Sequence, residues 1–474
     1  MHELGRGRRV AILLICCMSL LIVGIDITAV NVALPSIGRD LHASISGLQW
    51  SVDAYTLVLA SFLMLSGSMG DRFGRKRVFL TGLTIFLISS LLCSIASNVG
   101  MLVAFRALQA IGGSMLNPVA MSIITNTFTD PRERSQAVGV WGAGVGISMA
   151  LGPIVGGALV SGISWRAIFL LNVPIGIAAI LLTARFIPES RAPKARRFDP
   201  FGQLLMIAFI ASLTFAIIEL PRHGIGSPMI LGTFALALAS LVGIIVVEPR
   251  RREPLLDLRF FKSAPFAGSI VIVTLAFAGF GAFLFLNTLY LQDARGFSAI
   301  HAGLETLPLA VVTMFVSPLS GRIVGRRGPR APLVCSGIAY LVACLMLSDL
   351  GLHTSMPLLF GAYVIFGFGF GAVNAPVTNA AVSGMPRAQA GVAAATASTS
   401  RQFGQTLGVA IAGAIVSSSA GGTHAGFTAA THLAWWLMAG CGIAVIVLGI
   451  AATGERARES ARRTAVELNP EALG

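Results

Sequence analysis

Three ionisable residues, Asp26, Asp53 and Arg106, lie inside long apolar stretches of the first half of the chain. A charge at membrane depth costs roughly 2.5–3.5 kcal/mol on insertion scales, so such a residue is a candidate for function. Carboxylates close to a guanidinium in a membrane are suited to proton transfer or cation binding. The alternatives are a structural Asp–Arg pair and, for Asp53, a place at the membrane interface.

These three residues must be positioned by helices that cross a membrane. The chain is 55% hydrophobic and 11% charged, whereas soluble domains are roughly 25% charged. About 20 apolar residues cross the hydrocarbon core. The sequence predicts an all-α integral membrane protein with fourteen such segments, at 10–33, 48–70, 78–97, 101–125, 136–161, 165–187, 201–220, 228–247, 265–290, 300–321, 331–350, 355–380, 390–418 and 431–452.

The net charge of +14 is explained by membrane orientation and contact with anionic lipid. Most of the 34 Lys and Arg residues fall in alternate loops, and only Arg39, Arg166, Arg222 and Arg295 fall in the others. The positive-inside rule then predicts that both termini are cytoplasmic. Because the basic residues do not form one patch, no nucleic-acid partner is expected.

A basic loop with one carboxylate occurs twice, which indicates an internal duplication. Residues 67–77 read GSMGDRFGRKR, and residues 321–328 repeat this pattern as GRIVGRRG. Gly67, Arg72 and Gly74 are matched in the second copy, whereas Asp71 is replaced by Gly325. A weaker echo pairs residues 117–119 with 374–377.

Known catalytic and cofactor motifs are not found in the sequence. No lysine follows a glycine, so there is no Walker A loop, and H-E-x-x-H and G-x-S-x-G do not occur. The six cysteines contain no C-x-x-C pair. We therefore expect a protein that is not an enzyme, with no metal, no cofactor and no disulfide framework. The apolar run at the N-terminus is expected to be a retained helix and not a cleaved signal.

The loop at 67–77 resembles the signature of the major facilitator superfamily. Residues 25–35, with Asp26 and Asn31, are similar to the first-helix motif of its fourteen-helix drug:proton antiporter branch. Three further stretches resemble its motifs in helices 4, 5 and 6, namely 102–118, 152–157 and 165–174. The chain departs from the family at Ala110, where glycine is usual.

The resemblance implies a major-facilitator-type fold with two six-helix bundles that rock around a central site. The implied division is a cytoplasmic N-terminus at 1–9, a bundle at 10–187, a linker with two transmembrane helices at 188–264, a bundle at 265–452 and a cytoplasmic tail at 453–474. Substrate and proton sites are then expected at Asp26, Asp53, Arg106 and Asn31.

Two further groups of residues are assigned by the resemblance. A cytoplasmic gate is expected at Gly67, Asp71, Arg72, Gly74 and Arg75, with Asp71 facing a helix N-terminus near 386–391. A tight contact of helix 5 is expected at Gly142, Gly146, Gly152, Pro153, Gly156 and Gly157. Ordinary packing of small residues would need the same stripe.

We therefore expect an antiporter in a bacterial plasma membrane, driven by the proton gradient. Its substrates would be amphipathic organic compounds, including drugs, antibiotics and cations. One alternative is an exporter of a single endogenous metabolite, which a narrow efflux profile would reveal. Another is a membrane sensor or scaffold that transports nothing, for which a large soluble domain would be expected.

Overall fold

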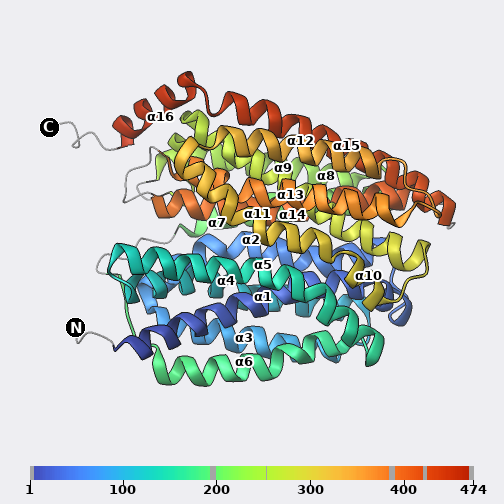
Figure 1. Ribbon diagram of the computed structural model, residues 1–474, viewed down its shortest axis with the longest axis horizontal. Helices are drawn as coiled ribbons and strands as arrows, with labels where there is room; N and C mark the ends of the chain where they lie inside the picture. Colours follow the sequence, from blue (N-terminus) through green and yellow to red (C-terminus); the bar gives the residue numbers. More distant parts are fainter. Residues whose placement is uncertain (1–4, 193–198, 252–253, 384–389, 420–423, 469–474) are drawn as a thin grey trace. The chain divides into compact units, whose positions relative to one another are not determined.

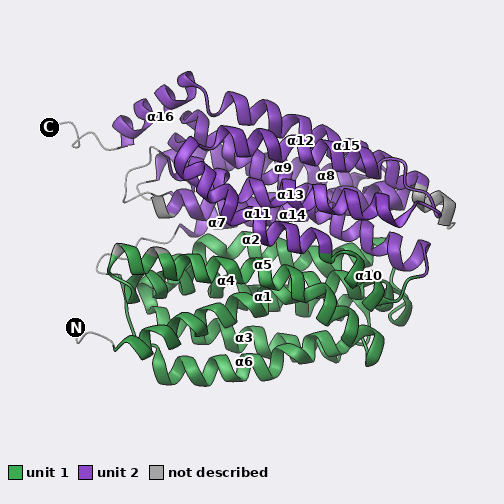
Figure 2. Ribbon diagram, viewed as in Figure 1, with its two compact units in different colours: residues 1–198, 297–307 green, residues 199–296, 308–474 purple. Residues whose placement is uncertain are grey.

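The protein is described by a computed structural model that covers residues 5–192, 199–251, 254–383, 390–419 and 424–468. All regular elements in these ranges are helical (Figure 1). The chain forms two compact units (Figure 2). Unit 1 comprises residues 1–198 and 297–307, and unit 2 comprises residues 199–296 and 308–474.

Unit 1 contains seven helices within the described residues. They are α1 (Arg6–Asp40), α2 (Ile45–Phe73), α3 (Arg75–Ser94), α4 (Val99–Thr127), α5 (Pro131–Gly162), α6 (Arg166–Phe186) and the short α10 (Ala299–Glu305). Its core is aliphatic and aromatic, with Tyr55, Phe79 and Leu116 fully buried. The helices α2 and α3 both pack along α4.

Unit 2 contains the remaining long helices and three short helical elements. They are α7 (Pro200–His223), α8 (Pro228–Val247), η1 (Glu248–Arg250), η2 (Leu258–Lys262), α9 (Ala264–Leu289), the π-helical η3 (Tyr290–Ala294), α11 (Leu307–Arg327), α12 (Arg330–Leu347), α13 (Met356–Val382), α14 (Ala390–Ser419), α15 (His424–Ala451) and α16 (Glu455–Leu468). Stacked rings fill its interior, with Phe283 on Phe366 at 4.5 Å between centroids.

The predicted membrane fold is confirmed. Thirteen helical stretches in the described residues are long and apolar enough to cross a membrane, and α10 and α11 count as one of them. The remaining predicted segment, 390–418, is the 30-residue helix α14, which carries Arg401. Helices are expected here because a chain inside lipid must satisfy its backbone hydrogen bonds internally.

The two units divide the chain differently from the boundaries that the sequence suggests. Helices α7 and α8 of the expected linker belong to unit 2, where α7 packs on α14. The Phe209 and Phe403 rings in that contact lie 5.8 Å apart. Conversely, α10 lies in the sequence between the two segments of unit 2, but it belongs to unit 1. The residues after Gly454, predicted as a charged tail, form the helix α16.

The internal repeat is visible in the geometry of its turns. Gly74 and Gly328 end the matched helices α2 and α11, and both have positive φ, at 110° and 81°. A side chain would be strained there. A Cβ atom on Gly67 would lie 3.7 Å from Pro118, and one on the matching Gly321 would lie 3.7 Å from Ala375. Both copies therefore use glycine for the same turn, and Gly67 and Gly321 face matching positions of a neighbouring helix at ordinary contact distance.

Polar contacts hold the helices of unit 1 together at both ends. At the end where α1 begins, Arg9 forms an ion pair with Glu133 of α5. At the opposite end, Asp40 forms an ion pair with Arg166 and accepts a hydrogen bond from the Trp165 indole at 2.9 Å. The helix α1 is therefore fixed against α5 and α6 at its two ends.

Candidate functional site

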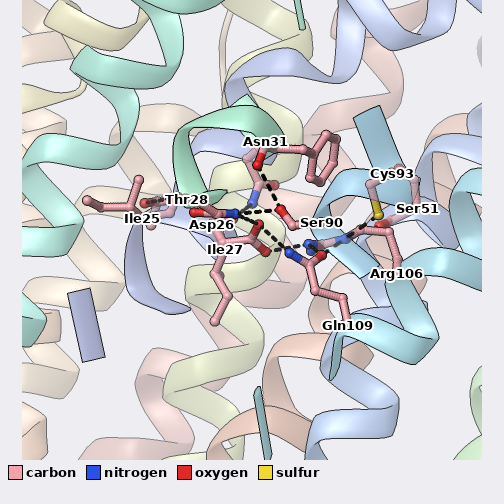
Figure 3. A network of polar contacts seen from close by, with 12 residues as sticks. Ile25, Asp26, Ile27, Thr28, Asn31, Ser51, Ser90, Cys93, Arg106 and Gln109 are labelled. Carbon is pink, nitrogen blue, oxygen red and sulfur yellow. Dashed lines mark hydrogen bonds and ion pairs between the residues drawn. The ribbon is translucent and has the colours of Figure 1, made fainter. Parts of the chain in front are cut away.

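Asp26 is fully buried in α1 and lies at the centre of a polar network (Figure 3). Its carboxylate forms an ion pair with Arg106 of α4. It also accepts hydrogen bonds from the amides of Gln109 and Asn172, each at 3.0 Å. Three donors surround one carboxylate, which compensates the loss of water around an ionised group.

Arg106 is held on several sides, with 1% of its surface exposed. Its Nε donates to the Ser51 carbonyl oxygen at 3.2 Å, and its Nη1 donates to Gln109 Oε1 at 2.8 Å. The guanidinium carbon lies 4.2 Å from the centroid of the Tyr55 ring, in range of a cation–π interaction. The cation is therefore positioned by α2 as well as by its partner Asp26.

The network continues to α3 through Ser90. Asn172 donates to the Ser90 hydroxyl at 3.0 Å, and this hydroxyl donates to the Phe169 carbonyl oxygen at 2.8 Å. Side chains from α1, α3, α4 and α6, together with the α2 backbone, thus meet around Asp26. A change in the charge of this carboxylate would be felt by five helices of unit 1.

Asp53 is also fully buried, but it lies outside this network. Its carboxylate forms no ion pair among the described residues, and its polar neighbour is the Thr56 hydroxyl of the same helix. Ser51 and Tyr55 contact Arg106 from one face of α2, and a residue between them at i+2 points to the other face. The structure therefore brings Asp26 and Arg106 together and places Asp53 elsewhere.

Asn31 is buried five residues after Asp26 on α1. Its amide donates to the Ile27 carbonyl oxygen at 2.9 Å, within the same helix. Its Oδ1 has no hydrogen-bond partner in the part of the chain that the structure describes. One acceptor of Asn31 is therefore free to bind a proton donor or a substrate group.

The turn between α2 and α3 is braced by ionic contacts within unit 1. Asp71 accepts a hydrogen bond from Arg75 Nη2 at 2.9 Å. Glu189, just after α6, accepts from the backbone N–H of Lys76 at 3.2 Å, and its carboxylate fills the space beside Gly74. An acid at the start of α3 also complements the helix dipole. The gate residues are thus packed against the segment after α6.

Two other predicted gate residues have different surroundings. Gly67 faces Pro118 of α4, whereas Arg72 is exposed and its guanidinium carbon lies 5.8 Å from the Phe73 ring centroid. The partner expected for Asp71, a helix end near 386–391, involves residues 384–389, which lie outside the described residues.

Small residues of α5 let it pack closely on α1. A Cβ atom on Gly152 would collide with the Thr28 side chain. One on Gly156 would lie 2.8 Å from the Cβ of Ala29. A larger residue at either position would push the two helices apart.

The other side of α5 packs on α10. A Cβ atom on Gly157 would lie 2.6 Å from the carbonyl oxygen of Ala299. One on Gly303 of α10 would collide with the Pro153 carbonyl group. Backbone therefore meets backbone in this contact, and it tolerates only small side chains.

The N-terminal part of the predicted stripe is more open. A Cβ atom on Gly142 would meet nothing within 4 Å, and Gly146 is half-buried. The neighbouring Gly144, which was not predicted, would place a Cβ 3.1 Å from the Leu20 side chain. The tight packing of α5 is thus centred on residues 152–157.

Sequence reasoning missed Ser90, Tyr55 and Glu189 as parts of these sites. Ser90 and Tyr55 are polar groups inside apolar helices, and that was the available signal. Glu189 is an acid in a mostly basic segment. Gln109 and Asn172 stood within the family motifs, but their shared contact with Asp26 required the folded chain.

A family model described as Major Facilitator Superfamily matches residues 16–409. The chain belongs to the major facilitator superfamily. The family predicted from the sequence motifs is thereby confirmed. The fold is also similar to a solved crystal structure, that of a bacterial homologue of the human lysosomal transporter Spinster in an inward-facing and unoccupied conformation. The TM-score is 0.61 and 20% of residues are identical, over 98% of each chain.

Several curated bacterial proteins are similar in sequence to this chain. The tetracenomycin C resistance and export protein of Streptomyces glaucescens is 35% identical over 88% of this chain and 77% of its own. The methylenomycin A resistance protein of Bacillus subtilis is 32% identical over 93% and 92%. The multidrug efflux pump LfrA of Mycolicibacterium smegmatis is 34% identical over 85% and 80%.

Proposed function

We propose that the protein is a proton-coupled antiporter that exports amphipathic organic compounds, drugs and antibiotics among them, across a bacterial plasma membrane. Transport would proceed by alternating access, in which the two six-helix bundles rock around a central site. Membership of the superfamily and the efflux functions named for its relatives support the export of small molecules. The proton gradient would be the only energy source.

The observation that carries this proposal is a pair of buried carboxylates with opposite surroundings. Asp26 has a guanidinium and two amides as donors, and is suited to the ionised form. Asp53 forms no ion pair among the described residues, has the Thr56 hydroxyl as a neighbour, and is suited to holding a proton. In the proposed cycle Asp53 would bind and release a proton, and Asp26 would couple protonation to the conformational change.

The coupling step would be the protonation of Asp26. Loss of its charge weakens the ion pair, while Arg106 keeps its contacts with Ser51, Gln109 and Tyr55. A ligand or proton shifts a conformational equilibrium only by its differential affinity for the two states. The proton would bind Asp26 with different affinities in the two conformations, because the five helices around Asp26 would hold its donors differently in each. Substrate release and protonation would thus be linked through one network.

The available energy is sufficient for export. One charge that crosses about 100 mV supplies roughly 2.3 kcal/mol. At about 1.4 kcal/mol per decade, this supports a gradient of some forty-fold for a neutral compound.

Export requires a defined orientation, and we place both termini in the cytoplasm. Cysteine substitution tests this at Gly5 and at Gly226 between α7 and α8, because an added Cβ meets nothing within 4 Å at either position. In a background without the native cysteines, an impermeant reagent added to whole cells should label the cysteine at 226 and not the one at 5. Equal labelling of both positions from outside would contradict the orientation.

Transport itself is tested in energised inverted vesicles. A panel of amphipathic compounds should accumulate in wild-type vesicles, and accumulation should fall when the pH gradient or the voltage is collapsed separately. Accumulation of one compound of the panel alone would instead support the alternative of an exporter for a single metabolite. Vesicles that accumulate nothing from the panel under either gradient would contradict the proposal.

A further inference from the structure

Arg401 of α14 is a cation in the interior of unit 2 that the proposed proton cycle does not use. It lies eleven residues after the start of α14 at Ala390, in a helix otherwise composed of apolar and neutral polar residues. Its side chain is half-buried, and its Nε is fully buried. A guanidinium does not lose its proton in a protein. The charge must therefore be compensated by another group.

Of the helices in unit 2 that pack near α14, α7 alone carries an acid in its described sequence, Glu219 close to its C-terminal end. The sequences of α9, α11, α12, α13, α14 and α15 contain neither Asp nor Glu. In unit 1, by contrast, Arg106 lies beside Asp26. Arg401 forms no ion pair among the described residues, and an intramembrane cation of this kind is a candidate site for an anion from outside the protein.

The hydrogen bonds of Arg401 leave donors available. Its Nη2 donates to the Thr378 hydroxyl of α13 at 2.6 Å, and its Nη1 lies 3.4 Å from the Ser398 hydroxyl. Its Nε has no partner among the described residues. Thr378 is exposed and donates to the Asn374 carbonyl oxygen at 2.9 Å. The Arg401 side chain thus reaches from α14 to the exposed Thr378 of α13.

Aromatic side chains lie beside this guanidinium. Its carbon is 5.9 Å from the centroid of the Phe277 ring. Phe277 lies 5.0 Å from Phe370, which stacks on Phe280 at 4.2 Å. An aromatic surface next to a planar cation with free donors matches an aromatic ring that bears an anionic group.

We infer that Arg401, with Thr378 and Phe277, binds the anionic group of an exported aromatic acid. The ligand class is an organic carboxylate or phenolate, and the guanidinium is its specificity determinant. This inference rests on the proposed export function and narrows its substrate class, because cations would be repelled from Arg401.

The inference has an electrical consequence. A cation that leaves the cell in exchange for one proton moves no net charge. An anion that leaves in exchange for one proton moves two charges in the same direction, so that the membrane potential would drive its export.

Binding to the purified full-length protein in nanodiscs of zwitterionic lipid tests the inference without any gradient. The probes are naphthalene-2-carboxylate and its methyl ester, which differ in charge at the same ring. The wild type should bind the acid more tightly than the ester. In Arg401→Gln this preference should fall about tenfold or more, which corresponds to the loss of a charge-assisted hydrogen bond. Arg401→Lys should retain part of it.

The matched control is Arg456→Gln, which removes an exposed cation from α16 and should leave the preference unchanged. Equal binding of acid and ester by the wild type would overturn the inference, as would an unchanged preference in Arg401→Gln. A preference that disappears in phosphatidylglycerol nanodiscs would assign the site to a lipid headgroup and overturn the substrate assignment. Binding of the acid without transport in vesicles would refute the export function alone.

Discussion

Arg106 forms its ion pair with Asp26 and leaves Asp53 without an ion-pair partner among the described residues. The helix α2 carries Asp53, and it also supplies the Ser51 carbonyl and the Tyr55 ring that contact Arg106. Asp53 lies on the opposite face of that helix. Arg106 therefore stabilises Asp26 and not Asp53. The same Asp→Asn substitution should have different effects at the two positions.

Asp26→Asn should destabilise the protein and abolish coupling. Removal of one partner of a buried ion pair costs about 3–5 kcal/mol, because the other charge remains buried. Proton release on substrate binding should also disappear. Thermal unfolding and pH measurements in weakly buffered solution check both effects. The double variant Asp26→Asn with Arg106→Gln should recover part of the stability. Wild-type proton release in the single variant would move the coupling site elsewhere.

Asp53→Asn should leave the melting temperature close to that of the wild type. Asn resembles a protonated acid in size but does not titrate. Proton-driven accumulation should be lost, whereas downhill exchange of substrate should continue. Asp349→Asn, at an exposed position, is the matched control and should transport normally. Full accumulation by Asp53→Asn would show that Asp53 carries no proton in the cycle.

Gly157→Ala should weaken the contact of α5 with α10. The added Cβ would lie 2.6 Å from the Ala299 carbonyl oxygen, and overpacking of this kind typically costs about 1–3 kcal/mol. We expect a lower melting temperature and faster decay of an imposed pH gradient in vesicles. Gly142→Ala makes the same change where nothing lies within 4 Å, and should behave as the wild type. Equal effects of the two substitutions would contradict a specific role for this contact.

Asp71→Asn should reduce transport while substrate binding survives. It removes the charge that pairs with Arg75 at the α2–α3 turn and, in the gating role that the family resemblance implies, biases the gate without altering the site. Turnover in vesicles and equilibrium binding separate the two effects. Gly325→Asp places an acid at the matching turn of the second copy, where an added Cβ meets nothing within 4 Å. Combined with Asp71→Asn, it tests whether an acid at that turn is sufficient to restore transport. Wild-type turnover in Asp71→Asn would exclude a gating role.

The membrane helices were predictable because their length is set by the bilayer and their composition by lipid. The segment 228–247 coincides with α8, and 265–290 differs from α9 by one residue at each end. The break between α10 and α11 at Thr306 was not predicted. The predicted segment 300–321 runs through it, although Glu305 and Pro308 flank the break, and α10 differs from α11 in packing on α5.

The charged residues of the buried site could be predicted from the sequence, but not which acid pairs with Arg106. Asp26 and Arg106 were identifiable because ionised groups are rare in apolar helices. The separation of Asp53 from them depends on the rotation of α2, which places Ser51 and Tyr55 toward Arg106. Helix rotation follows from tertiary packing, and a sequence with apolar residues on all sides carries little information about it.

The membership of α10 in unit 1 has a consequence for assembly from fragments. If the chain is divided between residues 192 and 199, the second fragment carries α10, whose packing partner α5 is in the first. The first fragment alone would leave the small-residue surface at Gly157 uncovered. Two co-expressed fragments would therefore associate by exchange of a structural element, and division of the chain after α10 would remove this means of complementation.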